Sequence, residues 1–244
     1  MGIERNLEMK ISDIKLLIEE GEGFELEFKR KVSSPEKIAR TLSAFANTRG
    51  GIMLFGVDDD GSIVGVESEK SELDFIHQAS ELCCVPPVEF TIEIIPHNWK
   101  DVIAVAVEES DDKPHAVVDE KDEEQKVFIR VNDNTVLASK EVIKVLRDER
   151  RDKPPLTVII GDNEKQLFGY FESNNRITVD EFAQLVNISH RRASRILTTL
   201  VRAGVIRIHT IEKSDYFTLA SNEEIIQKES ARNRTTQFHT QRRH

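Results

Sequence analysis

The fold is decided by residues 44–61, which read AFANTRGGIMLFGVDDDG. Gly50 predicts the end of a helix, because glycine is the residue that most often follows the last helical turn. Residues 51–57 are apolar apart from glycine, which predicts a strand covered on both faces. Residues 58–61 are rich in aspartate and end in glycine, so they predict a turn. Residues 62–66 are then expected to pair back as a hairpin.

A second informative segment, residues 22–29, reads EGFELEFK. Its apolar residues alternate with charged ones, which is the period of a half-buried strand. The alternation places Glu25, Glu27 and Lys29 on one face of that strand. We expect this segment to lie next to the central apolar strand and its aspartate turn. Several acids and one lysine would then lie close together.

Helices and strands are mixed throughout the first 148 residues. The pattern predicts a helix over residues 12–20, a helix over 35–49, a helix after Ser71, strands over 88–95, 102–107 and 127–131, and a helix from Ser139 to about Arg147. Residues 111–125 are highly charged and predict a flexible loop instead. Trp99 lies in an expected hairpin turn, where a packing role is favoured over an exposed stacking role. This mixture of elements indicates an α+β domain.

Short motifs spread over residues 10–148 carry a family resemblance. The motifs are Glu22, Glu27-Phe-Lys29, Ala44-Phe-Ala-Asn-Thr48, Gly50-Gly51, Gly56-Val-Asp-Asp59, Lys113-Pro-His115, Phe128-Ile-Arg-Val131 and Ala138-Ser139. Together they resemble the Schlafen AlbA-type domain family, which implies a mixed-sheet α+β domain. The family has been described as DNA-binding in many prokaryotic proteins, where it is often joined to a helix-turn-helix segment.

The resemblance also implies a site. In the vertebrate nuclease members of the family, two glutamates five residues apart and a later aspartate form the cleavage site for transfer RNA. Those positions match Glu22, Glu27 and Asp59, and Lys29 matches a nearby functional lysine. Three carboxylates would offer oxygen ligands to Mg²⁺ or Mn²⁺, which would neutralise a phosphate and activate water. The plainer alternative is an ordinary hairpin turn beside strand residues that face solvent.

The second part of the chain has its own pattern. Residues 149–156 contain a charged stretch that ends in Pro154-Pro155, and they predict a linker. Residues 157–220 contain three helical patterns and then two alternating segments, which is typical of a winged helix-turn-helix domain. Thr178, with an acid three residues later, predicts one helix start, and Ser189 predicts the next. Residues 221–244 are polar and predict a basic, disordered tail.

The third predicted helix is basic in a chain whose formal net charge is -10. No Asp or Glu occurs between residues 182 and 211, whereas five arginines do. The candidate contacts to nucleic acid are Ser189, His190, Arg191, Arg192 and Arg195. Arginine at the start of such a helix binds phosphates or guanine edges. The alternative is a winged helix that contacts protein, with the arginines merely solvated.

Composition bounds the remaining classes of function. Residues 1–156 hold 34 acidic and 21 basic side chains, whereas residues 157–244 hold 13 basic and 10 acidic ones, and this asymmetry suggests a nucleic-acid face on the second part. Two adjacent cysteines give neither a metal spacing nor a disulfide framework, which fits a cytoplasmic protein. No apolar run is long enough for a membrane span. A Gly-x-x-x-x-Gly-Lys-Ser/Thr run is absent, so no ATPase motif is present.

The sequence therefore favours a DNA-binding transcriptional regulator with a Schlafen AlbA-type domain and a winged helix. The alternative is a metal-dependent endoribonuclease that acts on tRNA or other structured RNA, with the winged helix holding the substrate. A protein-interaction adaptor is a third class, because the first part is so acidic. We expect a homodimer, since two related domain copies embrace the RNA in the family's nucleases and a chain with one copy would pair with itself.

Overall fold

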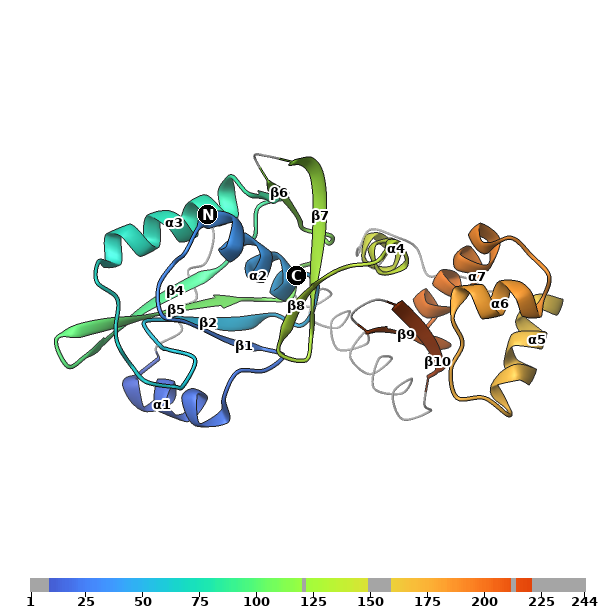
Figure 1. Cartoon of the computed structure of the whole chain (residues 1–244), viewed down its shortest axis with the longest axis horizontal. Coiled ribbons are helices and arrows are strands. Elements are labelled where there is room, and N and C mark those ends of the chain that lie inside the picture. The colour runs from blue at the N-terminus through green and yellow to red at the C-terminus, as the bar shows by residue number, and fades with distance from the viewer. Residues whose placement is uncertain (1–8, 120–121, 149–158, 212–213, 221–244) are drawn as a thin grey trace, which may run out of the picture. The chain divides into compact units, whose positions relative to one another are not determined.

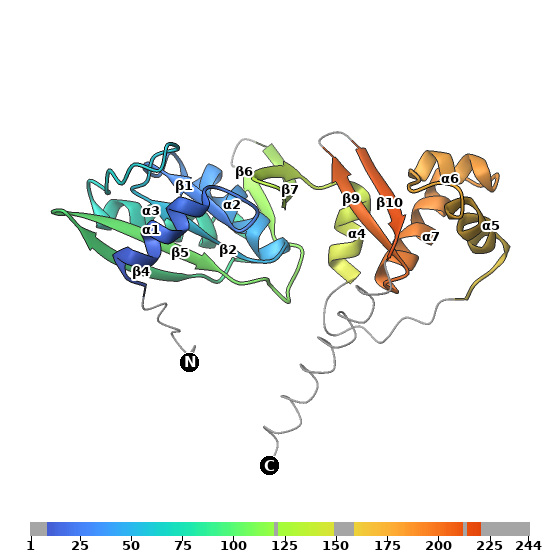
Figure 2. The same ribbon diagram turned by 90° about the horizontal axis from the view of Figure 1, so that it is seen from below.

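The computed structural model describes residues 9–119, 122–148, 159–211 and 214–220, and it divides into two compact units (Figures 1 and 2). The first unit contains the described residues up to Ala138. The second unit contains residues 139–148 together with the described residues from 159 onward.

The first unit is built around a four-stranded mixed sheet. In spatial order its strands are β1 (Leu26–Lys29), β2 (Gly51–Phe55), β5 (Lys100–Val107) and β4 (Thr91–His97). β1 runs parallel to β2, and the other neighbours are antiparallel. β2 is buried from Met53 to Phe55, as expected for a central strand covered on both faces. The predicted α+β class with a mixed sheet is confirmed.

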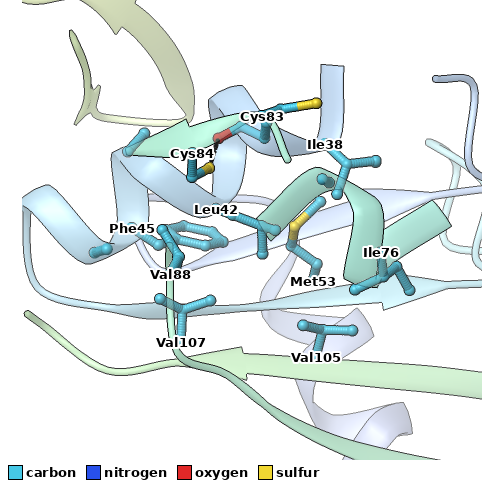
Figure 3. Close-up of a cluster of buried hydrophobic side chains, with 14 of the residues drawn as sticks. Ile38, Leu42, Phe45, Met53, Ile76, Cys83, Cys84, Val88, Val105 and Val107 are labelled. Atoms are coloured by element: carbon cyan, nitrogen blue, oxygen red, sulfur yellow. Dashed lines mark hydrogen bonds between the residues drawn. The ribbon is translucent and has the colours of Figure 1, made fainter. Parts of the chain in front are cut away.

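Helices cover both faces of this sheet (Figure 1). α2 (Pro35–Asn47) and α3 (Glu69–Glu81) pack on one face, where Phe45 and Met53 belong to the larger apolar cluster (Figure 3). α1 (Ile11–Glu20) packs on the opposite face and contributes to a separate cluster. The sheet therefore separates two apolar layers.

The two cysteines belong to the larger cluster and follow α3 in the chain, with Cys84 Sγ lying 3.7 Å from the Ala39 backbone oxygen of α2 (Figure 3). Cys83 and Cys84 are both buried and form no disulfide. Burial raises the pKa of the Cys84 thiol to about 12, so this thiol stays protonated near neutral pH. Both residues act as small apolar side chains of the core.

A second sheet in the first unit contains β3 (Cys84–Val85), β6 (Ala116–Asp119), β7 (Asp122–Val131) and β8 (Asn134–Leu137), in this spatial order. The flexible loop predicted over residues 111–125 is therefore wrong for its second half, because β6 pairs with β7. Residues 122–126 are mostly charged and lack an apolar alternation. Their strand conformation comes from pairing with β6, a tertiary contact that local pattern does not reveal.

The Asn47 side chain joins α2 to the second sheet. Its Nδ2 donates to the backbone oxygens of His115 and Phe128 at 2.9 Å each, and its Oδ1 accepts from the His115 backbone N–H at 2.8 Å. All the hydrogen bonds of this amide are buried, so each replaces one that water would otherwise make. Asn47 thus has a structural role within the AFANT motif.

The His115 ring is buried between two polar atoms. Nδ1 lies 2.8 Å from the Pro86 backbone oxygen, and Nε2 lies 2.7 Å from Ser110 Oγ. Burial lowers the pKa of His115 below its ordinary value of about 6.5, because the charged imidazolium is poorly solvated there. The folded protein therefore keeps this ring neutral over a pH range in which the unfolded chain already binds a proton.

A pH dependence of stability follows from this shift. Below a pH of about 6.5 the unfolded state binds more protons at His115 than the folded state does. As the pH is lowered further, the free energy of unfolding should therefore decrease, until the pH reaches the lowered pKa of His115 in the folded protein. Urea unfolding between pH values of about 7.5 and 5.5 measures this slope. The slope should be shallower in His115→Gln and unchanged in the control Gln78→Ala, which removes an exposed side chain that does not titrate. Equal slopes in both variants would contradict the assignment.

The second unit combines helices with a two-stranded hairpin. Its elements are α4 (Lys140–Asp148), α5 (Asp162–Phe171), α6 (Val179–Leu185), α7 (His190–Arg202), β9 (Ile206–Ile211) and β10 (Ser214–Leu219). β9 and β10 are antiparallel, and Phe182, Leu197 and Phe217 are fully buried between the helices and the hairpin. The predicted order of three helices followed by two strands is confirmed. α4 packs on α7 in this unit, although the sequence analysis placed it at the end of the first domain.

None of the described helices is both long and apolar enough to cross a membrane.

Candidate functional site

The start of α7 is fixed by two successive helix caps. Thr178 Oγ1 accepts from the Glu181 backbone N–H at 3.2 Å, and the Glu181 carboxylate accepts from the Thr178 N–H at 2.7 Å. Ser189 Oγ accepts from the Arg192 N–H at 3.4 Å and caps α7. Asn187 turns the chain between α6 and α7 with a φ of 51°, a conformation that asparagine tolerates well. Both predicted caps are confirmed.

α7 has a buried face and a basic exposed face. Ala193, Leu197 and Leu200 are fully buried on the inner face. The exposed side chains near the helix start are His190, Arg191, Arg192 and Arg195. Arg191 and Arg195 stand one turn apart on the same side, as i and i+4 residues do. Among the described residues no acidic side chain forms an ion pair with Arg191, Arg192 or Arg195.

Two of the predicted contacts already have partners inside the protein. The Ser189 side chain caps α7, and His190 Nε2 lies 3.6 Å from Asp180 Oδ1. Ser189 thus positions the arginines that follow it and leaves the charge at this end to Arg191, Arg192 and Arg195.

α4 braces α7 through a polar contact that the sequence analysis missed. Ser194 is buried, and its Oγ donates to Glu141 Oε1 at 2.8 Å and accepts from Lys144 Nζ at 2.7 Å. At the other end of α7, Arg202 lies 3.5 Å from Asp148. These contacts hold the helix at both ends. They join segments about fifty residues apart, so no local motif reveals them.

The hairpin carries an aromatic stack on one face. The His209 and Tyr216 rings lie 4.9 Å apart and nearly parallel, and the Arg176 guanidinium lies 5.7 Å from the Tyr216 centroid. His209 and Tyr216 face each other across the strands. Arg176 and His209 are therefore two further polar groups, both on this face of the β9–β10 hairpin. Neither was predicted as a candidate contact from the sequence.

The acids matched to the nuclease site have partners within the first unit. Glu27 is only 14% exposed, and its carboxylate pairs with Lys29 Nζ and with Arg130 Nη1, the latter at 2.8 Å. Glu22 Oε1 accepts from the Phe28 backbone N–H at 2.7 Å. Both glutamates therefore have partners in the protein. Glu22 binds the backbone of β1, and Glu27 binds Lys29 on β1 and Arg130 on β7.

Asp59 stands apart in the exposed turn after β2. Its backbone N–H donates to Asp58 Oδ1 at 3.2 Å, and Asp58 in turn pairs with Arg30 at 2.7 Å. Within the part of the chain that the structure describes, no group of three His, Cys, Asp or Glu side chains is arranged to hold a metal ion. Glu27 is thus neutralised by Arg130 and Lys29, whereas Asp59 lies in the turn after β2 beside Asp58.

Arg130 is the residue that organises this region. It is nearly fully buried, and it donates to the Gly23 backbone oxygen at 2.6 Å and to Thr135 Oγ1 at 3.0 Å in addition to Glu27. Its guanidinium also lies 5.1 Å from the centre of the Phe45 ring. One side chain of β7 thus ties the start of β1 to α2.

Residues 22–139 match the family model described as Schlafen, AlbA_2. The match runs from just before β1 to just after β8 and supports a Schlafen AlbA-type domain in the first unit.

Two solved structures are similar to this chain. The N-terminal domain of an ATP-dependent DNA helicase RecG-related protein from Nitrosomonas europaea is 22% identical, with a TM-score of 0.38 over 44% of this chain and 81% of that one. The DIP2311 protein from Corynebacterium diphtheriae is 14% identical, with a TM-score of 0.43 over 87% of this chain and 43% of that one.

Proposed function

We propose that this chain is a DNA-binding transcriptional regulator, and that residues 157–220 act as a winged helix-turn-helix module. The observation that carries the proposal is the exposed basic side of α7. Arg191, Arg192 and Arg195 are exposed there, opposite the apolar face of the helix. In a helix-turn-helix module, the N-terminal residues of the recognition helix contact base edges in the major groove.

Charge supports duplex DNA as the partner. The whole chain is acidic, yet residues 182–211 contain no Asp or Glu. Phosphates approaching the exposed face of α7 would therefore meet several arginines, and the acid Asp180 at this end lies 3.6 Å from His190. Arginine suits this role because its planar fork binds phosphates and guanine edges with two hydrogen bonds.

The first unit favours this function over the metal-dependent ribonuclease. A catalytic carboxylate must be available to a metal ion, whereas Glu27 pairs with Arg130 and Lys29. The Schlafen AlbA-type unit would then act as a partner-binding or RNA-contacting unit of the regulator. A homodimer would present two copies of α7 to a palindromic site, as is common for this class.

Binding of the full chain to nucleic acid tests the proposal. Labelled duplex DNA from a pool of random sequences and transfer RNA should be titrated with the protein, each with and without Mn²⁺. We expect duplex binding that weakens steeply as salt rises, since phosphate contacts release counterions. Cleavage of the transfer RNA in Mn²⁺ without any duplex binding would reject the regulator in favour of the nuclease.

A further inference from the structure

The β4–β5 hairpin ends in an exposed tryptophan. Figures 1 and 2 show this hairpin extending beyond the helices of the first unit. β4 ends at His97 and β5 begins at Lys100, so Asn98 and Trp99 form the turn. The Trp99 side chain is 104% exposed, which means that it is as accessible as in an extended peptide. The packing role expected from the sequence is therefore wrong.

The backbone of this turn is also unfavourable for tryptophan. The φ angles of Asn98 and Trp99 are 46° and 66°, and a two-residue hairpin loop of type I′ requires positive φ at both positions. Asparagine followed by glycine is the favoured pair for such a loop, because a bulky side chain resists positive φ. Trp99 thus combines a disfavoured backbone conformation with full exposure of a large apolar ring, and neither stabilises the fold.

The turn is held on a rigid base. Val102 and Ile103, just behind it, are fully buried, and β4 and β5 pair without interruption from the turn to Thr91. The Lys100 stem lies against Gly65, where a Cβ atom would come within 2.4 Å of it. The backbone that carries Trp99 is therefore held in place, which lowers the backbone entropy lost when the ring binds a partner.

The immediate neighbours of Trp99 are polar. Lys100 and Asn98 are exposed, and Asn98 Nδ2 lies 3.0 Å from His97 Nε2. The nearest large apolar side chain on the same strands that is exposed, Ile94, is three rungs from the turn, roughly 10 Å away. A single aromatic ring beside a cation does not form the broad apolar patch of a protein interface. It does match a nucleobase stacked on the ring with its phosphate near the lysine.

We propose that Trp99 stacks on an unpaired base of single-stranded DNA or RNA, with Lys100 contacting the backbone. The inference rests on the nucleic-acid binding proposed above and adds a second contact, outside α7. The stacking face of a base is open in a single strand and closed inside a continuous duplex, so the hairpin would prefer unpaired segments.

Trp99 is the only tryptophan in the chain, so its fluorescence reports this contact directly. The full chain should be titrated with oligo(dT), with oligo(U), and with closed circular duplex DNA, which has no ends. We expect both single strands to quench the tryptophan emission and the circular duplex to leave it unchanged. The two oligonucleotides distinguish DNA from RNA as the source of the base.

Variants provide a second readout, with labelled oligonucleotides. Trp99→Gly restores the favoured turn pair, so it should raise the thermal midpoint of unfolding and yet weaken single-strand binding by about 5- to 150-fold. Trp99→Phe should retain most of the affinity because it keeps an aromatic face. Leu82→Ala, which removes an exposed apolar side chain elsewhere on the first unit, should change nothing.

The outcomes separate this inference from the proposed function. If the protein binds duplex DNA but neither oligo(dT) nor oligo(U) changes its tryptophan emission, the stacking role of Trp99 is overturned and the proposed regulator function stands. Quenching by single strands without duplex binding would support the stacking role of Trp99 and reject α7 as a helix that binds duplex DNA. The stacking role would also be overturned if Trp99→Gly bound single strands as tightly as the native chain does.

Discussion

Replacement of Arg130 by alanine will lower the free energy of unfolding of the first unit by about 3–5 kcal/mol, the range observed when one partner of a buried ion pair is removed. The substitution leaves Glu27 charged and mostly buried, with only Lys29 to compensate. It also leaves the Gly23 and Phe24 backbone oxygens without this donor. The two cysteines of the chain are buried in the first unit, so the rate of thiol labelling at increasing urea measures this loss.

Two further variants make this test specific. Glu27→Gln should cost less than Arg130→Ala, since the guanidinium keeps the amide oxygen, the Gly23 backbone oxygen and Thr135 Oγ1 as acceptors. Glu25→Gln removes a charge from an exposed side chain of the same segment and should leave the labelling curve unchanged. An Arg130→Ala protein as stable as the native chain would show that the pair with Glu27 is not structural.

Replacement of both Arg191 and Arg195 by alanine will weaken duplex binding roughly 30-fold or more, if each arginine contributes the usual 1–3 kcal/mol. Both side chains are exposed and lie opposite the buried face of α7, so folding should be unaffected. Fluorescence anisotropy of a labelled duplex measures the affinity. Circular dichroism checks that the helices are retained.

The matched control removes the same charge from other helices. Lys140→Ala with Lys165→Ala changes two exposed side chains on α4 and α5, outside the proposed contact surface. This pair should lower the affinity only slightly, through long-range electrostatics. Equal losses in the two double variants would mean that net charge, and not α7, determines binding.

The features that the sequence predicted correctly depend on neighbouring residues. The central strand after Gly50, the capping box at Thr178 and the cap at Ser189 are each encoded within a few positions. Such signals are local, so a single sequence reveals them. The mixed sheet was anticipated through the motif resemblance and not through these local patterns.

The features that the sequence did not predict depend on distant contacts. Arg130 lies 103 positions from Glu27, and their pairing changes a candidate metal ligand into part of a buried ion pair. α4 directly follows the first unit in the chain, yet Glu141 and Lys144 contact Ser194 on α7. Exposure of Trp99 is likewise set by how far its hairpin extends from the core. Local periodicity carries no information about any of these three.

The central claim is that the arginines at the start of α7 contact duplex DNA, at its phosphates as well as at base edges. The most direct test is the slope of log affinity against log salt for the native chain and for Arg191→Ala with Arg195→Ala. Each lost phosphate contact reduces the magnitude of that slope by about 0.9, so the double variant should be shallower by about two units. The Lys140→Ala with Lys165→Ala control should keep the native slope. A native slope in the arginine variant would contradict the claim.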